Sequence, residues 1–160
     1  MALDRGDLDR YRIDCGSLGI TQIRHLDDPG RSTQVLEEHR FGVLGVERDG
    51  KPPHLTPVYY VLDGDDIIVS ITKSRVKARL IETAGRVTLL VLHEQFPFDY
   101  LAVLGKARLE DEGAVETMAR IGEKMYGRPV GPEMRPALEE RAQKEGRIVL
   151  RITPESYYAR

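Results

Sequence analysis

The sequence predicts a mainly β fold with flanking helices, in the form of an antiparallel barrel that is closed or partly split. Three observations predict it. Six stretches alternate apolar and polar residues as strands do, hairpin-type turns join most of them, and one helix separates the third stretch from the fourth. Closing such a sheet into a barrel removes its exposed edges. The six predicted strands are residues 41–47, 54–62, 66–72, 86–92, 99–110 and 147–153.

The composition indicates one globular domain that can fold without disulfides or metal. The chain has 160 residues, of which 41% are hydrophobic and 31% are charged. Its net charge of −2 gives no overall field that would attract nucleic acid or an anionic membrane, so any anion site must come from a local concentration of charge. The longest strongly apolar run, residues 87–92, is too short to span a membrane. Residues 1–7 lack the apolar core of a signal peptide, and Cys15 stands alone, so we expect a reducing, cytoplasmic location.

The first thirty residues differ from the rest of the chain. They show little periodicity, and we expect residues 1–30 to be an irregular extension of a domain that spans residues 31–160. A turn is predicted at Asp27-Asp28-Pro29-Gly30, where the extension ends. The predicted helices are residues 32–40 (with Ser32-Thr33 as N-cap), 74–83, 113–126 and 136–144.

Periodicity also predicts which side chains are buried. In the strand 66–72, Ile67 and Ile71 share one face and Ser70 lies on the other. The last strand is expected to expose Arg147 and Arg151. The helix 113–126 carries an apolar stripe that requires a partner surface, formed by Ala114, Met118, Ile121 and Met125.

Most catalytic signatures are absent from the sequence. The four histidines do not have the spacing of a metal site, and no second cysteine accompanies Cys15. The sequence contains no nucleophile-elbow, Walker A or Gly-x-Gly-x-x-Gly motif. The sequence therefore indicates neither a metal site nor a nucleophile.

One charged motif stands out, at the start of the predicted helix 74–83. The helix dipole places partial positive charge at this end, so acidic residues are expected there and each cation costs roughly 0.3–1 kcal/mol. A bound phosphate would remove the conflict, because backbone N–H groups and cationic side chains would converge on one anion. A solvated basic helix face is the alternative. The cations are Lys73, Arg75, Lys77 and Arg79.

Two further segments have the residue types to contact a flat ligand. Pro57 interrupts a strand that is rich in β-forming residues, and because it cannot donate to a ladder its nitrogen must face a bulge, an edge or a ligand. Phe96, Phe98 and Tyr100 lead into the predicted strand 99–110, where exposed rings could cover a cofactor. An edge strand with a bulge is the alternative for Pro57, and core packing or a dimer seam is the alternative for the aromatic residues.

Taken together, these segments resemble the pyridoxamine 5'-phosphate oxidase-like FMN-binding split-barrel superfamily. The closer resemblance is to its branch of flavin- and deazaflavin-dependent oxidoreductases. The most specific feature is the Thr56-Pro57-Val58 strand followed by the helix start Arg75-x-Lys77-x-Arg79. The resemblance runs from about Ser32 to Tyr158, through residues 41–46, 49–52, 54–61, 70–80 and 100–107.

The resemblance implies a homodimer of six-stranded split barrels with two cofactor clefts at the interface. It also implies which residues contact the cofactor. These are Thr56, Pro57 and Val58 along the ring, Ser70, Ile71 and Lys73 beside the ribityl chain, Arg75 and Lys77 at the phosphate, and Phe98 and Tyr100 in a segment that reaches the cofactor of the other subunit.

The cofactor and reaction follow from the same resemblance. FMN needs one phosphate site, whereas coenzyme F420 has a phosphodiester and a polyglutamate tail, which the larger cation cluster favours. We therefore expect an oxidoreductase that transfers a hydride between reduced F420 and a small organic acceptor, with an FMN-dependent oxidase or reductase as the alternative. A non-catalytic nucleotide-binding barrel is an alternative of another class. Arg75 and Arg79 match half of the PilZ cyclic-dinucleotide motif, but the other half is missing. No residue is nominated as proton donor or haem ligand.

Overall fold

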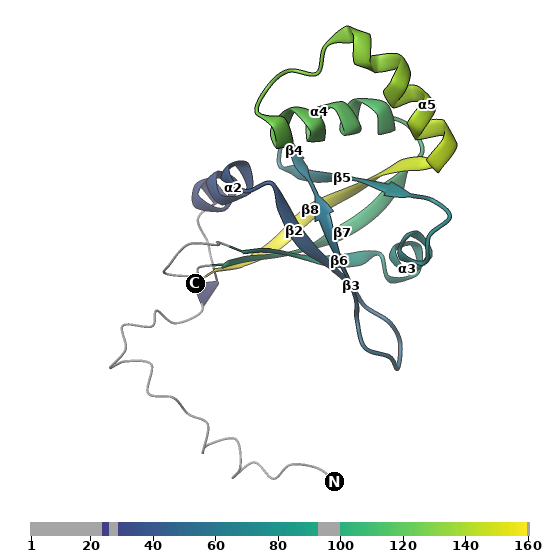
Figure 1. The fold of residues 1–160 in the computed structure, drawn as a ribbon. Coiled ribbons are helices and arrows are strands. Elements are labelled where there is room, and N and C mark those ends of the chain that lie inside the picture. The colour runs from purple at the N-terminus through teal and green to yellow at the C-terminus, as the bar shows by residue number, and fades with distance from the viewer. Residues whose placement is uncertain (1–23, 26–28, 93–99, 160) are drawn as a thin grey trace, which may run out of the picture.

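The computed structural model describes residues 24–25, 29–92 and 100–159, and it shows one curled antiparallel sheet flanked by helices (Figure 1). In chain order the elements are β1 (Arg24–His25), α2 (Pro29–Glu38), β2 (Phe41–Val46), β3 (His54–Tyr59), β4 (Val61–Asp63), β5 (Asp66–Thr72), α3 (Val76–Ala84), β6 (Arg86–Leu92), β7 (Tyr100–Glu110), α4 (Ala114–Tyr126), the 3₁₀ helix η2 (Pro132–Met134), α5 (Arg135–Glu145) and β8 (Arg147–Ala159).

The sheet curls until its two ends meet. Its strands are ordered β3-β2-β6-β7-β8-β5-β4, so β3 and β4 lie at opposite ends of the hydrogen-bonded path. In the sequence, however, only Tyr60 separates them. Tyr60 is fully buried, so the chain turns through the core where it passes from one end of the sheet to the other. This arrangement confirms the predicted split barrel.

The strand count differs from the six that the sequence predicts. The predicted strand 54–62 is two strands, because the chain changes partner at Tyr60: β3 pairs with β2, and β4 pairs with β5. The path therefore has seven strands. In addition, β1 pairs with the end of β8, although its residues fall within the stretch predicted as an irregular extension. The remainder of that stretch before α2 lies outside the described residues.

The core contains the side chains that alternation assigns to it. Ile67, Val69 and Ile71 of β5 belong to the main cluster, whereas Ile68 belongs to a smaller cluster on the opposite face. Complete burial of one such side chain stabilises the fold by roughly 1.5–3 kcal/mol. The register of β5 is therefore strongly specified, and with it the outward direction of Ser70.

Two element boundaries differ from the predictions for local reasons. The first helix starts at Pro29 instead of Ser32, because proline suits the first helical position and the predicted turn there is the helix start itself. The last strand continues beyond residue 153 to Ala159. A proline such as Pro154 usually ends a strand, but here it pairs with Gly105 of β7 beside a β-bulge. Only glycine fits at position 105, because a Cβ atom there would lie 2.6 Å from the carbonyl oxygen of Thr153.

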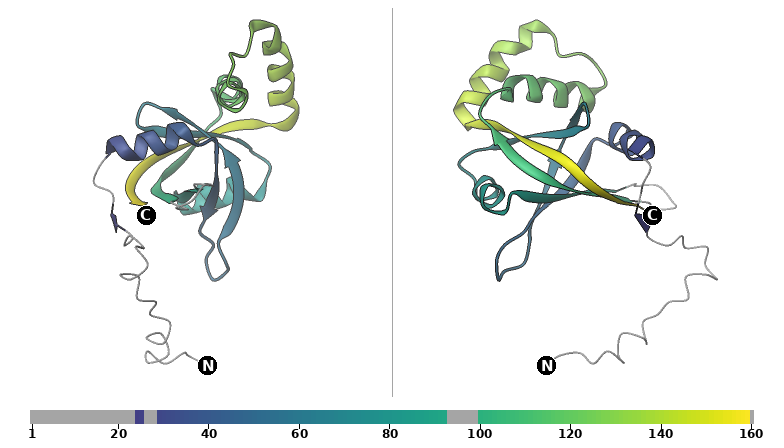
Figure 2. Two further views of the ribbon diagram at one scale, coloured as in Figure 1. Left: turned by 60° about the vertical axis from the view of Figure 1, so that its left-hand side comes forward. Right: turned by 180° about the vertical axis from the view of Figure 1, so that it is seen from behind.

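The helices cover different parts of the barrel. Figure 2 shows α4 and α5 side by side on one side of the sheet, with α2 and α3 away from them. The apolar stripe of α4 finds its predicted partner surface here, since Ile121 packs against Val61, Ile68 and Val149 on the outer face of the sheet. None of the helices in the described part of the chain is long and apolar enough to cross a membrane.

Candidate functional site: a half-buried cation cluster

The helix α3 begins with uncompensated positive charge. Its N-cap residue is Arg75, with extended backbone angles (φ −81°, ψ 152°) and no capping hydrogen bond from a side chain. The first turn contains no acidic residue. The helix starts two residues later than the predicted Ser74, but the cations still surround its first turn, where the dipole already favours an anion.

Lys77 connects this helix start to the Thr-Pro-Val strand. Its Nζ donates a hydrogen bond to the Oγ1 of Thr56 over 3.3 Å. Two motifs that are 21 residues apart in the sequence therefore meet in the structure. Burial lowers the pKa of Lys77, and the nearby charges of Arg75 and Arg147 lower it further. The charged form of Lys77 is thus destabilised where it stands, and a bound anion would relieve this.

Arg147 is a member of the cluster that the sequence analysis missed. It is the first residue of β8, opposite Thr72 at the end of β5, and its Nη1 donates to the carbonyl oxygen of Ser70 over 3.5 Å. Its side chain is only 22% exposed, contrary to the prediction that alternation places it in solvent. The reason is that α5 and the end of β5 cover the start of β8 (Figure 1). The only sequence signal was an arginine directly after the helix-terminating Gly146.

The remaining predicted residues of β3 and β5 divide between the two faces of the sheet. The side chains of Val58 and Ile71 are in the core, so only their backbone could contact a ligand. Pro57 is exposed on β3, which is an end strand of the path, and this confirms the edge position that its missing N–H requires. Lys73 points to the surface, where its Nζ donates to Asp111 over 2.6 Å.

Of the predicted aromatic residues the structure describes Tyr100, which does not join the cluster within this chain. Tyr100 pairs with Leu92 of β6 and belongs to β7, three strands from β3 along the path. Phe98 lies outside the described residues. Their predicted contact with a cofactor therefore stays a prediction.

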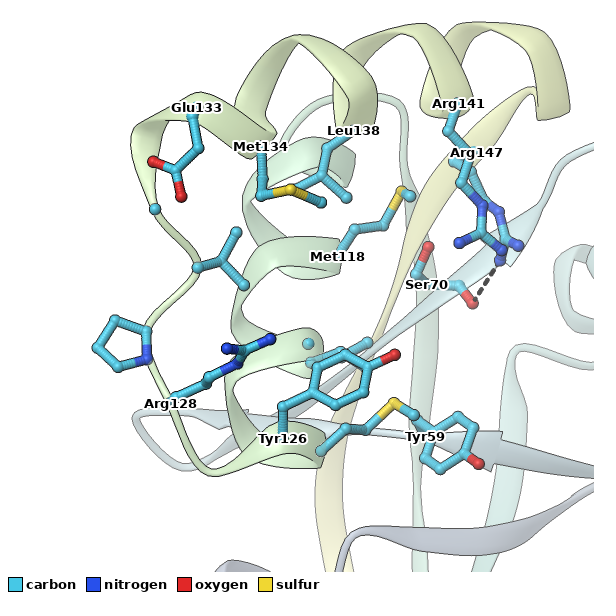
Figure 3. Close-up of a pocket in the computed structure, with 16 residues that line it drawn as sticks. Tyr59, Ser70, Met118, Tyr126, Arg128, Glu133, Met134, Leu138, Arg141 and Arg147 are labelled. Atoms are coloured by element: carbon cyan, nitrogen blue, oxygen red, sulfur yellow. Dashed lines mark hydrogen bonds between the residues drawn. The ribbon is translucent and has the colours of Figure 1, made fainter.

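A pocket of about 560 Å³ adjoins the cluster (Figure 3). It lies between α4, α5 and the segment that joins them, and Ser70 and Arg147 form part of its wall. The Oγ of Ser70 is buried and, within the described residues, has no hydrogen-bond partner. Arg147 therefore belongs to the wall of the pocket, and its charge also acts on Lys77.

Comparisons with known proteins agree on one family. Residues 30–160 match the family model for pyridoxamine 5'-phosphate oxidase. Among solved structures, the chain is similar to the conserved hypothetical protein Rv2991 from Mycobacterium tuberculosis, with a TM-score of 0.71 and 19% identity over 86% of this chain and 88% of that one. No curated protein matches the sequence.

Two further structures extend the similarity to proteins named for their cofactors. An F420 reductase has a TM-score of 0.61 and 21% identity over 78% of this chain and 93% of that one. A FAD-binding protein from Mesorhizobium loti has a TM-score of 0.59 and 18% identity over 87% of this chain and 97% of that one. At these identities the structures establish the fold alone. The family match over residues 30–160 shows that this chain belongs to the pyridoxamine 5'-phosphate oxidase family.

Proposed function

We propose that the protein is a cytoplasmic oxidoreductase that binds coenzyme F420 in a cleft between two copies of the chain and transfers a hydride between F420 and a small organic acceptor. The bound deazaflavin would supply the hydride chemistry. The protein would bind the cofactor, orient it against the acceptor and exclude water.

The observation that carries this proposal is the hydrogen bond from Lys77 to Thr56. It puts a half-buried cation, with Arg75 and Arg147 nearby, directly beside the edge strand that would lie along the cofactor ring. The charged form of Lys77 is disfavoured by burial and by its neighbours, so a phosphate group beside it would stabilise all three cations. The donor set thus fits the phosphodiester of the cofactor.

The extent of the positive charge favours F420 over FMN. FMN carries one terminal phosphate, which Arg75 and Lys77 alone could bind. The exposed Arg79 extends the positive charge one turn along α3. A longer anionic cofactor would make use of this additional charge.

The outer face of the β2–β3 hairpin supports the homodimer. Phe41 and Tyr59 pack edge to face with ring centroids 6.3 Å apart, yet the two side chains are 46% and 47% exposed. Leu55, on the same face of β3, is 62% exposed. Large apolar side chains that gather on one exposed face are typical of a protein interface. A second copy packed here would also bring its own segment around Tyr100 to the cleft.

A titration of the purified protein with F420 and with FMN, followed by cofactor fluorescence, tests the proposal. We expect saturable binding of F420 that is tighter than binding of FMN, and a loss of affinity in Lys77→Gln. Lys144→Gln, which removes an equal charge from the exposed end of α5, is the matched control and should bind normally. Binding of neither cofactor would refute the proposal.

FMN is the second candidate, because the matching family model is named for an oxidase of pyridoxamine 5'-phosphate and a FAD-binding protein is among the similar structures. Tighter binding of FMN in the same titration would select it. Sedimentation of the chain as a dimer supports the interface, and sedimentation as a monomer argues against a shared cleft.

A further inference from the structure

The pocket between α4 and α5 has the size and walls of a small-molecule site, and the proposed cofactor does not account for it. Its volume of about 560 Å³ lies within the usual range for such sites. We propose that it binds an amphipathic organic anion, a molecule with an apolar body and one acidic group. We further propose that this molecule is the hydride acceptor, a step that rests on the proposed function.

The apolar part of the pocket comes from the two helices and their connection. Met118 of α4 faces Met134 and Leu138 across it (Figure 3), and Ile121 also lines this part. With Met125, three of the four methionines in the chain line this one pocket. Thioether side chains are flexible and polarizable, so such a wall adapts to apolar molecules of different shapes. An apolar body would fill this part.

The other end of the pocket is polar and carries excess positive charge. Arg141 and Arg147 share one carboxylate, because their Nε atoms donate to the two oxygens of Glu145 over 2.9 Å and 2.6 Å. Two guanidinium groups on one carboxylate leave one positive charge uncompensated. In Figure 3 these guanidinium groups lie side by side above Ser70, whose buried hydroxyl has no partner in the described part of the chain. An acidic group placed here would accept charge-assisted hydrogen bonds from the two arginines and a further hydrogen bond from the Ser70 hydroxyl.

The remaining charges of the pocket do not cancel this excess. Glu133 lies at the opposite side, on η2 (Figure 3). Arg128 also lines the pocket, and among the described residues it has no ion-pair partner. The pocket is therefore apolar in the middle and positive where Arg141 and Arg147 lie.

The position of the polar end connects the pocket to the proposed cofactor. Arg147 contributes to the wall, and it pairs across the sheet with Thr72, which lies three residues before Arg75, the N-cap of α3. A molecule held by Arg147 would thus lie next to whatever anion the cluster at α3 binds. This proximity is why we assign the occupant as the acceptor.

Two fluorescent probes that differ in charge test the binding without any cofactor. 8-Anilinonaphthalene-1-sulfonate carries an apolar body and a sulfonate, and N-phenyl-1-naphthylamine has a similar body without charge. We expect the wild-type protein to bind the sulfonate at one site per chain. Arg141→Gln should weaken the sulfonate about tenfold, as expected for one hydrogen bond to a charged group, and should change the affinity of the neutral probe less than twofold.

Matched variants make the result specific. Arg135→Gln removes an exposed arginine from the same helix, where it pairs with Glu139 outside the pocket, and should change neither affinity. Gly122→Phe should block both probes. A Cβ atom at Gly122 would already contact Val130 at 3.4 Å, and a larger side chain would enter the pocket. Gly122→Leu is the smaller replacement should the first variant melt at a lower temperature than wild type.

The proposal is overturned if Arg141→Gln binds the sulfonate as wild type does, or if both probes still bind the folded Gly122 variants. Because Arg141→Gln is expected to keep the neutral probe, its effect cannot come from unfolding. The cofactor titration of Lys77→Gln reports separately on the proposed function. If the protein binds neither F420 nor FMN but still binds the sulfonate through Arg141, the pocket is an anion site and its occupant is not a hydride acceptor.

Discussion

Arg147 and Arg151 lie four residues apart on the same strand, and their side chains are 22% and 18% exposed. Their partners differ. Arg151 donates to three carboxylates, those of Asp63 at 2.7 Å, Asp66 at 3.3 Å and Glu110 at 2.9 Å. Among the described residues, the one carboxylate that pairs with Arg147 is Glu145, which it shares with Arg141.

The difference separates a structural ion network from a ligand site. Arg151 lowers the pKa values of Asp63 and Glu110, so the chain itself stabilises the charged forms of these two carboxylates. At Lys77 the effect is the opposite, since burial and the neighbouring cations Arg75 and Arg147 lower its pKa and disfavour its charge. A half-buried cluster that its own chain leaves positive is therefore suited to bind an anion.

The largest expected effect is the loss of cofactor binding from the cluster at α3. Arg75→Ala combined with Lys77→Ala should weaken F420 binding about a hundredfold, because two charge-assisted hydrogen bonds are lost. The difference from wild type should be greatest at low salt, since the Debye length falls from about 10 Å at 0.1 M to about 3 Å at 1 M. Fluorescence titration at both salt concentrations measures it.

The same double variant should not destabilise the fold, because it removes positive charge from a helix N-terminus. If the double variant melts at a lower temperature but binds F420 normally, the cluster stabilises the fold and is not a ligand site.

Arg151→Met, unlike the Arg75 and Lys77 double variant, should destabilise the fold. We expect it to lower the free energy of unfolding by about 2 kcal/mol at pH 7, because three carboxylates lose their common partner. Asp63 and Glu110 have lowered pKa values in the folded protein, so their contribution is present above about pH 4 and is lost as the pH falls through the folded values. Urea unfolding should show a larger loss at pH 7 than at pH 3.

Arg108→Met is the matched control, since Arg108 is 63% exposed and pairs with Glu110 at the surface. It should cost less than about 0.5 kcal/mol. Equal losses in the two variants would mean that the Arg151 network contributes no more than an exposed ion pair.

The sequence predicts the local features of this molecule well. The alternation of Ile67, Val69 and Ile71 assigns the buried face of β5, because burial on one face requires a period of two. The cations at the start of α3 are close together in the sequence, so the order of residues alone reveals their conflict with the helix dipole.

The long-range features could not be predicted. The contact of Lys77 with Thr56 depends on the turn of the chain at Tyr60, which brings the ends of the sheet together. Arg147 follows the same alternation as Arg151, and what buries it is the cover of α5 and the end of β5. The extension of β8 beyond Pro154 depends on Gly105 of another strand. Such contacts join distant segments, and periodicity does not encode them.

The affinity for F420 should depend on pH through the protonation of Lys77. Because an anion favours protonated Lys77, affinity should fall as the pH rises through the lowered pKa of that group, by up to about tenfold. The fall should begin below the ordinary lysine value of about 10.4. Lys77→Arg should keep its affinity over the same range, since arginine stays protonated. A similar fall in both proteins would assign the titration to another group.

The smallest expected effect concerns Lys124. No carboxylate pairs with it among the described residues, but a backbone carbonyl and an aromatic ring of the chain contact its ammonium group. Its Nζ donates to the carbonyl oxygen of Leu36 over 2.7 Å and lies 4.3 Å from the centroid of the Tyr60 ring. Burial lowers its pKa to about 8, and the attraction of Glu37 offsets this only in part. A lowered lysine pKa alone therefore does not mark a ligand site.

Between pH 8 and pH 10 the unfolded chain holds the Lys124 proton more tightly than the folded one, so the free energy of unfolding should rise with pH. We expect a rise of about 1 kcal/mol after allowing for solvent screening, and no such rise in Lys124→Met. Urea unfolding of the two proteins at both pH values measures the difference. Parallel pH profiles would show that Lys124 titrates normally.

A crystal structure of the protein with F420 is the strongest test of the cation cluster as the phosphodiester site. We expect phosphodiester oxygens within hydrogen-bond distance of the Lys77 Nζ and the Arg75 guanidinium, while Arg151 keeps its three carboxylates. F420 bound with its phosphodiester away from this cluster, and Lys77 still on Thr56 alone, would contradict it.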